Sequence, residues 1–212
     1  MLELGVKALI SYLLGSLLGS LVLGRAKGVD IREQGSGNAG GTNALRTQGW
    51  TFALGVVVID VGKALLAVGL LPGLDLPFVG VDPSLDRGWL EVASATAVVV
   101  GHVYPVWYEF RGGKGAATLL GAVAMLAPAA LVPVILVWLA CVMLTGYVGL
   151  GTMLGTAALP AYFALARPGD VPLLAFGVAM TAFVVYTHRA NVARMRAGSE
   201  NRARRLWLLR PR

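Results

Sequence analysis

Long apolar runs alternate with short polar stretches along most of this chain. An α-helix rises about 1.5 Å per residue, so a run of about 20 apolar residues is long enough to cross the hydrocarbon core of a bilayer. The pattern therefore predicts membrane-spanning helices. Five of them are unambiguous, and they cover residues 2–24, 51–71, 89–108, 148–166 and 171–187.

The stretch 115–146 is too long for one span and is interrupted by Pro128 and Pro133. It is either one span or two, 115–127 and 129–145. If there are two spans, one side of the membrane holds the 25–50 loop, the 109–114 loop and the tail. These segments carry four, two and eight Lys/Arg, which is 14 of the 18 in the chain. Cytoplasmic loops carry such an excess, so this arrangement is favoured.

We therefore expect an all-α integral membrane protein with seven transmembrane helices in one domain, residues 1–212. Its N-terminus lies outside and its C-terminus in the cytoplasm. The fourth helix is short, and its positive dipole end points toward Lys114 and Gly115.

Composition agrees with a membrane protein. The chain has 212 residues, 57% hydrophobic and 14% charged, with a net charge of +7, whereas soluble domains carry roughly 25% charged residues. Arginines crowd the tail 188–212, which is typical of an anchor on anionic lipid. We expect no nucleic-acid partner, because no basic soluble domain is present. The first span is read as a retained helix, since no cleavage site precedes it.

Asp60 and Lys63 interrupt the second span. Each unpaired charge at mid-depth would cost about 2.5–3.5 kcal/mol, so the two must pair, face protein or lie near an end. Three residues apart, they share a helix face and can pair with each other. Intramembrane charges are functional candidates, either directly or in support of a site.

Between the third and fourth spans, residues 101–118 combine His102 with the cluster Gly112-Gly113-Lys114-Gly115. Glycines around a lysine leave backbone N–H groups able to point at one ligand, with an ammonium in reach, which suits a phosphate. A P-loop is excluded, because Gly115 stands where Ser or Thr is required. The alternative is a flexible turn at the membrane edge.

The first polar loop, 25–50, is too long for a tight turn. Its glycines permit unusual backbone conformations, and Asn43 to Arg46 resembles a helix start with Arg46 in the first turn. Arg46 is a bidentate candidate for phosphate. A solvated linker is the alternative reading, because linkers share this composition. The residues of interest are Gly35, Ser36, Gly37, Asn38, Thr42, Asn43 and Arg46.

At the start of the tail, His188, Asn191 and Arg194 fall on one face at helical spacing. They are either structural groups at a membrane edge or three donors beside a phosphate loop. The sequence holds no metal-ligand motif and no nucleophile elbow, so we expect neither a metal nor a cofactor.

Three stretches together resemble one family. Gly35 to Asn43 with Arg46 is similar to its first motif, and Gly101 to Pro105 with Gly112 to Thr118 to its second. His188 to Asn191 with Arg194, Gly198 and Glu200 is similar to its third. The chain thus resembles the bacterial acyl-phosphate-dependent glycerol-3-phosphate acyltransferases, the PlsY family, nearly end to end. Asp60 and Lys63 resemble that family's charged pair. Gly41 and Tyr108-Glu109 depart mildly from its pattern.

The resemblance implies transfer of a fatty acyl group from acyl phosphate to glycerol 3-phosphate. The products would be lysophosphatidic acid and inorganic phosphate, in the first acylation of phospholipid synthesis. It implies an enzyme of the bacterial inner membrane whose site faces the cytoplasm, with no coenzyme A and no acyl-carrier protein. The partners expected are the two substrates and the lipid bilayer, and we expect a monomer.

Residue roles follow from that chemistry as hypotheses. Lys114, Ser36, Asn38 and the glycines 112, 113 and 115 would hold the acyl-phosphate head. Arg46, His188, Asn191 and Arg194 would hold glycerol 3-phosphate, with Thr42 and Asn43 shaping the pocket. The five expected catalytic residues are His188, Ser36, Lys114, Asn191 and Arg46. Gly35, Gly37 and His102 join the binding residues, and Asp60, Lys63 and Glu200 support them.

The proton acceptor is left open between His188, since imidazole titrates near neutrality, and the departing phosphate. Three other classes compete with the acyltransferase: a transporter for organic phosphates, a metal-dependent alcohol phosphotransferase, and a purely structural membrane protein. Transporters usually place their sites near the midplane, whereas the polar groups here gather at one edge.

Overall fold

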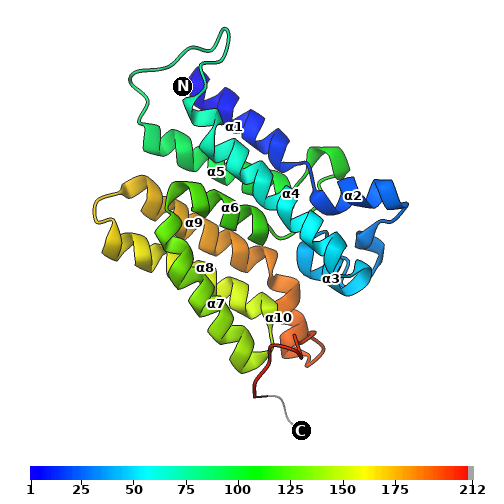
Figure 1. The fold of residues 1–212 in the computed structure, drawn as a ribbon. Coiled ribbons are helices and arrows are strands. Elements are labelled where there is room, and N and C mark those ends of the chain that lie inside the picture. Colours follow the sequence, from blue (N-terminus) through cyan, green and yellow to red (C-terminus); the bar gives the residue numbers. More distant parts are fainter. Residues whose placement is uncertain (210–212) are drawn as a thin grey trace. The chain divides into compact units, whose positions relative to one another are not determined.

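A computed structural model describes residues 1–209, and within that range every regular element is helical (Figure 1). The chain divides into two compact units, Met1–Leu126 and Ala127–Arg212. Residues 210–212, the end of the expected basic tail, lie outside the described residues. The single domain expected from the sequence stays a prediction.

The first unit has six α-helices that pack largely around α4. Helix α1 packs against α5, α6 packs against α4, and α2 and α3 also lie on α4. The bounds are α1 Leu2–Gly15, α2 Gly19–Lys27, α3 Gly41–Gln48, α4 Trp50–Gly69, α5 Arg87–Val103 and α6 Ala116–Leu126. Short 3₁₀ turns occupy Ile31–Glu33, Leu71–Gly73 and Val106–Tyr108.

Leu2–Lys27 is a candidate membrane span, as expected for residues 2–24, but it is not one continuous helix. It breaks between α1 and α2, at Ser16–Leu18. The flanking glycines allow close approach, because a Cβ on Gly15 would overlap the carbonyl of Val98 and one on Gly19 would approach that of Val56 to 2.7 Å. A break inside a membrane is tolerated where neighbouring groups satisfy the freed backbone atoms.

The second unit is a helical hairpin extended by two more helices. Helix α8 (Val148–Ala166) packs against both α7 (Leu131–Thr145) and α9 (Val171–Thr187). The bounds of α8 and α9 agree with the expected spans 148–166 and 171–187. Helix α9 continues into α10 (Arg189–Arg196) through a bend of 51°.

Five helical segments of the described chain are long and apolar enough to cross a membrane, and six if α9 and α10 together form one span. Helix α6 is shorter, at 11 residues, in line with a short helix after Lys114. The all-helical architecture is thus confirmed, while the number of seven spans and their orientation stay predictions.

The chain after Glu200 folds back onto the turn between α7 and α8. Ala203 N donates to the carbonyl of Gly146 at 2.7 Å, and Leu208 N to that of Met143 at 2.9 Å. The guanidinium of Arg202 lies over the rings of Tyr147 and Trp207. Arg202, expected at the lipid surface, is therefore held by protein groups.

Candidate active site

The first polar loop is organised by one buried side chain, that of Asn43. Its Oδ1 accepts from Ser36 N at 2.9 Å, and its Nδ2 donates to the carbonyls of Ile31 and Gln34 at 2.9 and 3.0 Å. Asn43 is 1% exposed. It therefore holds the loop backbone from beneath, while the pocket-shaping role expected for it stays a prediction. Gly35, at φ +58°, leaves the room that Oδ1 occupies.

The other residues of this loop lie nearer the surface. Ser36 and Asn38 are half-buried, and Gly37 and Thr42 are exposed. Helix α3 begins at Gly41, two residues earlier than the sequence suggested, so Arg46 lies in its last turn and not in its first. Arg46 is exposed near the C-terminal end of α3. The helix dipole favours an anion at the N-terminal end, so it does not assist anion binding by Arg46.

The two polar stretches of the first unit lie side by side. Arg32 Nη1 donates to the carbonyls of Tyr108 and Arg111 at 3.4 and 3.3 Å. The Tyr108 side chain packs in one buried cluster with Ala39, Leu18 and Leu21. Asp30 holds Arg32 through its side chain, and this contact lowers the pKa of the Asp30 carboxyl and raises that of Arg32. Sequence reasoning missed Arg32, although its place beside Asp30 signals a fixed guanidinium.

The glycine cluster after α5 folds back on the end of that helix. Gly112 N donates to the carbonyl of Val103 at 3.2 Å and Gly113 N to that of His102 at 3.1 Å. The expectation that these two N–H groups point at a ligand is therefore wrong. What the glycines provide is close packing, because a Cβ on Gly112 would overlap the His102 carbonyl oxygen. Gly115 adopts φ +85°, which side chains disfavour.

Beneath this loop lies a buried polar set on α4 and α5. Lys63 Nζ is 3.3 Å from Asp60 Oδ1 and 2.9 Å from His102 Nδ1. Lys63 Nζ also donates to the carbonyls of Gly15 and Leu17 at 2.7 and 2.8 Å, which are freed by the break between α1 and α2. Pairing of Asp60 with Lys63 is thus confirmed, and the ammonium satisfies the interrupted span.

His102 is 2% exposed, with its ring under the glycine loop. It was expected to bind substrate, and the structure places it behind the loop. Lys114 is half-buried just after Gly113, at the entrance to α6. The first unit therefore brings together the first two polar stretches and the pair Asp60 and Lys63.

The third polar stretch belongs to the second unit and begins with His188, 5% exposed. Its Nδ1 is 2.8 Å from the carbonyl oxygen of Val184. Because a carbonyl only accepts, Nδ1 must carry the hydrogen, and in the neutral ring Nε2 then holds the lone pair. This is the tautomer that a proton acceptor acting through Nε2 requires.

Glu200 joins the two other residues of this stretch. Its Oε1 accepts from Asn191 Nδ2 at 2.8 Å, and its Oε2 accepts from Arg194 Nε at 2.6 Å. The side chain of Glu200 is 4% exposed, so this ion pair is shielded. Gly149 on α8 leaves the room in which the Asn191 side chain lies. Glu200 thus holds the Asn191 amide and the Arg194 guanidinium, and its supporting role at a substrate site stays a prediction.

No group of three or more His, Cys, Asp or Glu that could hold a metal ion occurs among residues 1–209. The carboxylates described above are paired with cations of the protein, and amides, hydroxyls and cations of the polar stretches are groups that can bind anions. Those cations include Arg46, Lys114 and Arg194.

Comparisons with known proteins agree with one another. The family model described as "Glycerol-3-phosphate acyltransferase" matches residues 6–198. A glycerol-3-phosphate acyltransferase of Chlorobaculum parvum is 37% identical to the chain, and the match covers 91% of this chain and 93% of that protein.

Two solved structures are also similar. They are crystal structures of PlsY (YgiH), an integral membrane glycerol 3-phosphate acyltransferase, in a glycerol 3-phosphate form and a lysophosphatidic acid form. The TM-scores are 0.80 and 0.76, with 33% identity and 94% of each chain covered.

Proposed function

Because this chain belongs to the glycerol-3-phosphate acyltransferase family, and is accordingly an acyltransferase of the membrane, we propose that its acyl donor is an acyl phosphate. The 1-hydroxyl of glycerol 3-phosphate attacks the acyl carbonyl, the carbon–oxygen bond to phosphate breaks, and lysophosphatidic acid and inorganic phosphate leave. The related crystal structures, named for glycerol 3-phosphate and lysophosphatidic acid forms, support this choice of acceptor and product.

The observation that carries the chemistry is the orientation of His188. With Nδ1 bonded to the Val184 carbonyl, Nε2 has the lone pair that takes the hydroxyl proton as the carbonyl is attacked. The departing phosphate is the competing acceptor. An acyl phosphate is already activated, so the reaction needs positioning and charge stabilisation and no covalent enzyme intermediate.

We assign the acyl-phosphate head to Lys114, Gly115, Ser36 and Asn38. Glycerol 3-phosphate is assigned to Arg46, His188, Asn191 and Arg194. Glu200 supports this set, because it fixes the Arg194 guanidinium and the Asn191 amide through two short contacts. Gly112 and Gly113 contribute to the acyl-phosphate site through the close packing of their loop, since their N–H groups already donate to backbone carbonyls.

The same proposal includes a monomer with seven spans in a bacterial inner membrane, and a site that faces the cytoplasm. Cysteine labelling in a Cys141→Ala background tests the orientation. A cysteine at Thr42 should react with an impermeant reagent only from the cytoplasm, and one at Ser84 only from outside. The same sidedness at both positions would overturn this arrangement.

The decisive assay mixes purified protein with acyl phosphate and glycerol 3-phosphate, without coenzyme A or added metal. We expect lysophosphatidic acid and free phosphate in equal amounts. Activity with an acyl thioester and none with acyl phosphate would overturn the proposed donor. Flux of glycerol 3-phosphate into liposomes without turnover would favour a transporter.

Two variants test the assigned roles. Lys114→Ala should abolish turnover in a folded protein, whereas Arg111→Ala, which removes a nearby exposed cation, should keep it. Near-native activity of Lys114→Ala would refute the phosphate role of Lys114. His188→Gln should lose most of its activity, and near-native turnover in that variant would leave the departing phosphate as the proton acceptor.

A further inference from the structure

The glycine loop and His102 fit each other on two sides. The His102 carbonyl accepts from Gly113 N, and the His102 ring fills the space that a Cβ on Gly113 would need, at Nε2. Gly113 has no left-handed φ, and the three atoms nearest to such a Cβ all belong to the His102 ring. His102 thus contacts the main chain at Gly113, just before Lys114, with both its backbone carbonyl and its ring.

The ring is fixed in turn from its opposite edge. A lysine ammonium has three N–H donors and no acceptor. Lys63 directs two of them at the carbonyls of Gly15 and Leu17. The contact of 2.9 Å with His102 Nδ1 takes the third, and the longer separations of 3.3 and 3.4 Å from Asp60 Oδ1 to Lys63 and His102 are secondary.

This arrangement sets the tautomer of His102. If the ammonium donates to Nδ1, that nitrogen carries no hydrogen and the proton lies on Nε2, on the side of Gly113. The ring is also 2% exposed, so it reaches no solvent through which it could exchange roles during a reaction. With the ammonium as donor to His102 Nδ1, His102 and His188 hold opposite tautomers: the hydrogen is on Nε2 in the first and on Nδ1 in the second.

We propose that His102 is a positioning residue, which fixes the Gly112–Gly115 loop from behind and thereby places the Lys114 side chain, and that Lys63 and Asp60 fix the ring. This replaces the substrate-binding role expected for His102. It also explains the intramembrane charges, because they connect the interruption of the first span to the loop that carries Lys114. The effect on turnover rests on the proposed function, whereas the contacts themselves do not.

A double-mutant cycle tests the fit. Gly113→Ala puts a methyl group where Nε2 lies, so the loop must shift, and a displacement of about 1 Å can cost about 10²-fold in turnover. His102→Ala should reduce turnover less. In the double variant the methyl group has room, so its activity should rise above that of Gly113→Ala, to the level of His102→Ala. Effects that simply multiply would overturn the proposal, because they would mean that ring and methyl group do not meet.

The matched control is Gly62→Ala on α4, next to Lys63, where a Cβ meets nothing within 4 Å. It should keep the wild-type turnover, which separates a clash at Gly113 from a general effect of alanine in this region. If the control falls as far as Gly113→Ala, the cycle measures fragility of the fold, and the positioning role is refuted.

The tautomer provides a test that needs no substrate and no change at His102, Lys63 or the glycine loop. The chain has two histidines, so the ¹⁵N-histidine spectrum of the whole protein contains two rings, and His188→Gln assigns them. We expect His102 to be neutral, with hydrogen on Nε2 alone. Hydrogen on Nδ1 of His102 would exclude the contact with the Lys63 ammonium and sink the proposal. If this signature holds while no acyl phosphate is turned over, the proposed function fails and the positioning contact stands.

Discussion

Two buried lysine–carboxylate pairs of the first unit look alike in sequence and differ in structure. Glu3 and Lys7 are four residues apart on α1, and Asp60 and Lys63 are three apart on α4. Both pairs lie in membrane-span candidates, and all four side chains are at most 5% exposed. The sequence reasoning selected the second pair as functional and passed over the first.

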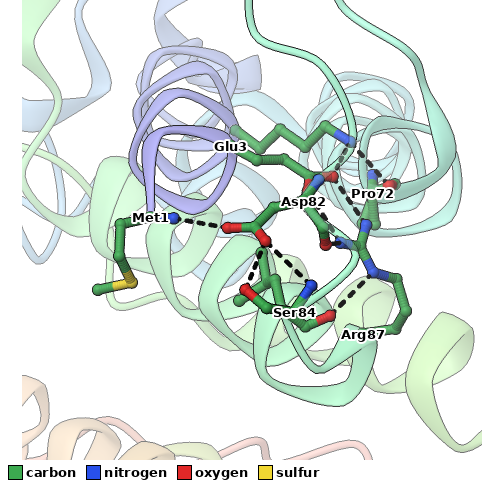
Figure 2. A network of polar contacts seen from close by, with 8 residues as sticks. Met1, Glu3, Pro72, Asp82, Ser84 and Arg87 are labelled. Atoms are coloured by element: carbon green, nitrogen blue, oxygen red, sulfur yellow. Dashed lines mark hydrogen bonds and ion pairs between the residues drawn. The ribbon is translucent and has the colours of Figure 1, made fainter.

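The Glu3 cluster is complete (Figure 2). Arg87 donates to both Glu3 oxygens at 2.7 and 2.8 Å, and the amide of Asp82 adds a third contact at 2.8 Å. Lys7 donates to Glu3 and to the carbonyl of Pro72. This cluster joins the start of α1 to the loop between α4 and α5, at the end of the unit away from α2 and α3 (Figure 1).

The Asp60 cluster is incomplete. Oδ1 accepts from Gly19 N at 3.1 Å and approaches Lys63, but Oδ2 has no hydrogen-bond partner among residues 1–209. A buried carboxylate oxygen without a partner is costly. We therefore interpret the Glu3 cluster as purely structural. In the Asp60 cluster one carboxylate oxygen stays without a partner in the described part of the chain, while Lys63 contacts His102 and the carbonyls at the break of the first span.

The largest contrast should come from removing each lysine. Lys63→Met leaves Asp60 buried beside freed carbonyls, and breaking such a pair costs about 3–5 kcal/mol of unfolding free energy. Lys7→Met should cost less, because Arg87 still pairs with both oxygens of Glu3. Thermal unfolding in detergent measures both. Equal losses would show that the two clusters are equivalent.

A second variant separates charge from shape. Lys63→Met combined with Asp60→Leu removes the whole pair, and apolar replacement of a buried pair is often close to neutral. We expect the double variant to be more stable than Lys63→Met and yet poorly active, because the His102 ring has lost its anchor. Full activity at restored stability would mean that the pair serves the fold alone.

A smaller effect is expected from Glu3→Gln. The neutral amide keeps the shape but weakens the contacts with Arg87 and Lys7, so the loop 71–86 should open more often. Hydrogen exchange of the Asp82 amide should therefore be faster, while turnover stays at the wild-type level. A clear loss of turnover would contradict a purely structural role for this cluster.

The smallest effect concerns acid pH at the same loop. Hydrogen bonds from Ser84, followed by the contact with the N-terminal ammonium, lower the pKa of Asp82 from 3.8 to about 2. A carboxylate with a lowered pKa stabilises the fold above its ordinary value, and this contribution fades as pH falls from about 4 to about 2. Asp82→Asn should flatten the pH dependence of stability in that window. An unchanged acid limb would rule out this contribution.

The sequence predicted most helix positions, and local spacing allowed the pairing of Asp60 with Lys63 that the structure shows. It could not show the break at Ser16–Leu18, because that depends on how closely Gly15 and Gly19 meet α5 and α4. It also misjudged the glycines, because a Gly-rich loop looks the same whether its N–H groups face a ligand or a carbonyl of the preceding helix. The signal missed for Glu3 and Lys7 was available, since two opposite charges one turn apart in an apolar span can pair with each other.

The segment that follows Glu200 provides hydrogen-bond donors to the backbone carbonyls at the end of α7. The Met143 carbonyl accepts from Leu208 N, and the Leu144 carbonyl accepts from Trp207 Nε1. The Thr145 carbonyl accepts from Arg202 Nη1, and the Gly146 carbonyl accepts from Ala203 N. These are acceptors that a helix leaves open at its end. A protein shortened before Arg202 would expose four acceptors at once, close to the Glu200 carboxylate that holds Asn191 and Arg194. Purification tags and reporters at this end are therefore better placed beyond a spacer that leaves these four hydrogen bonds intact.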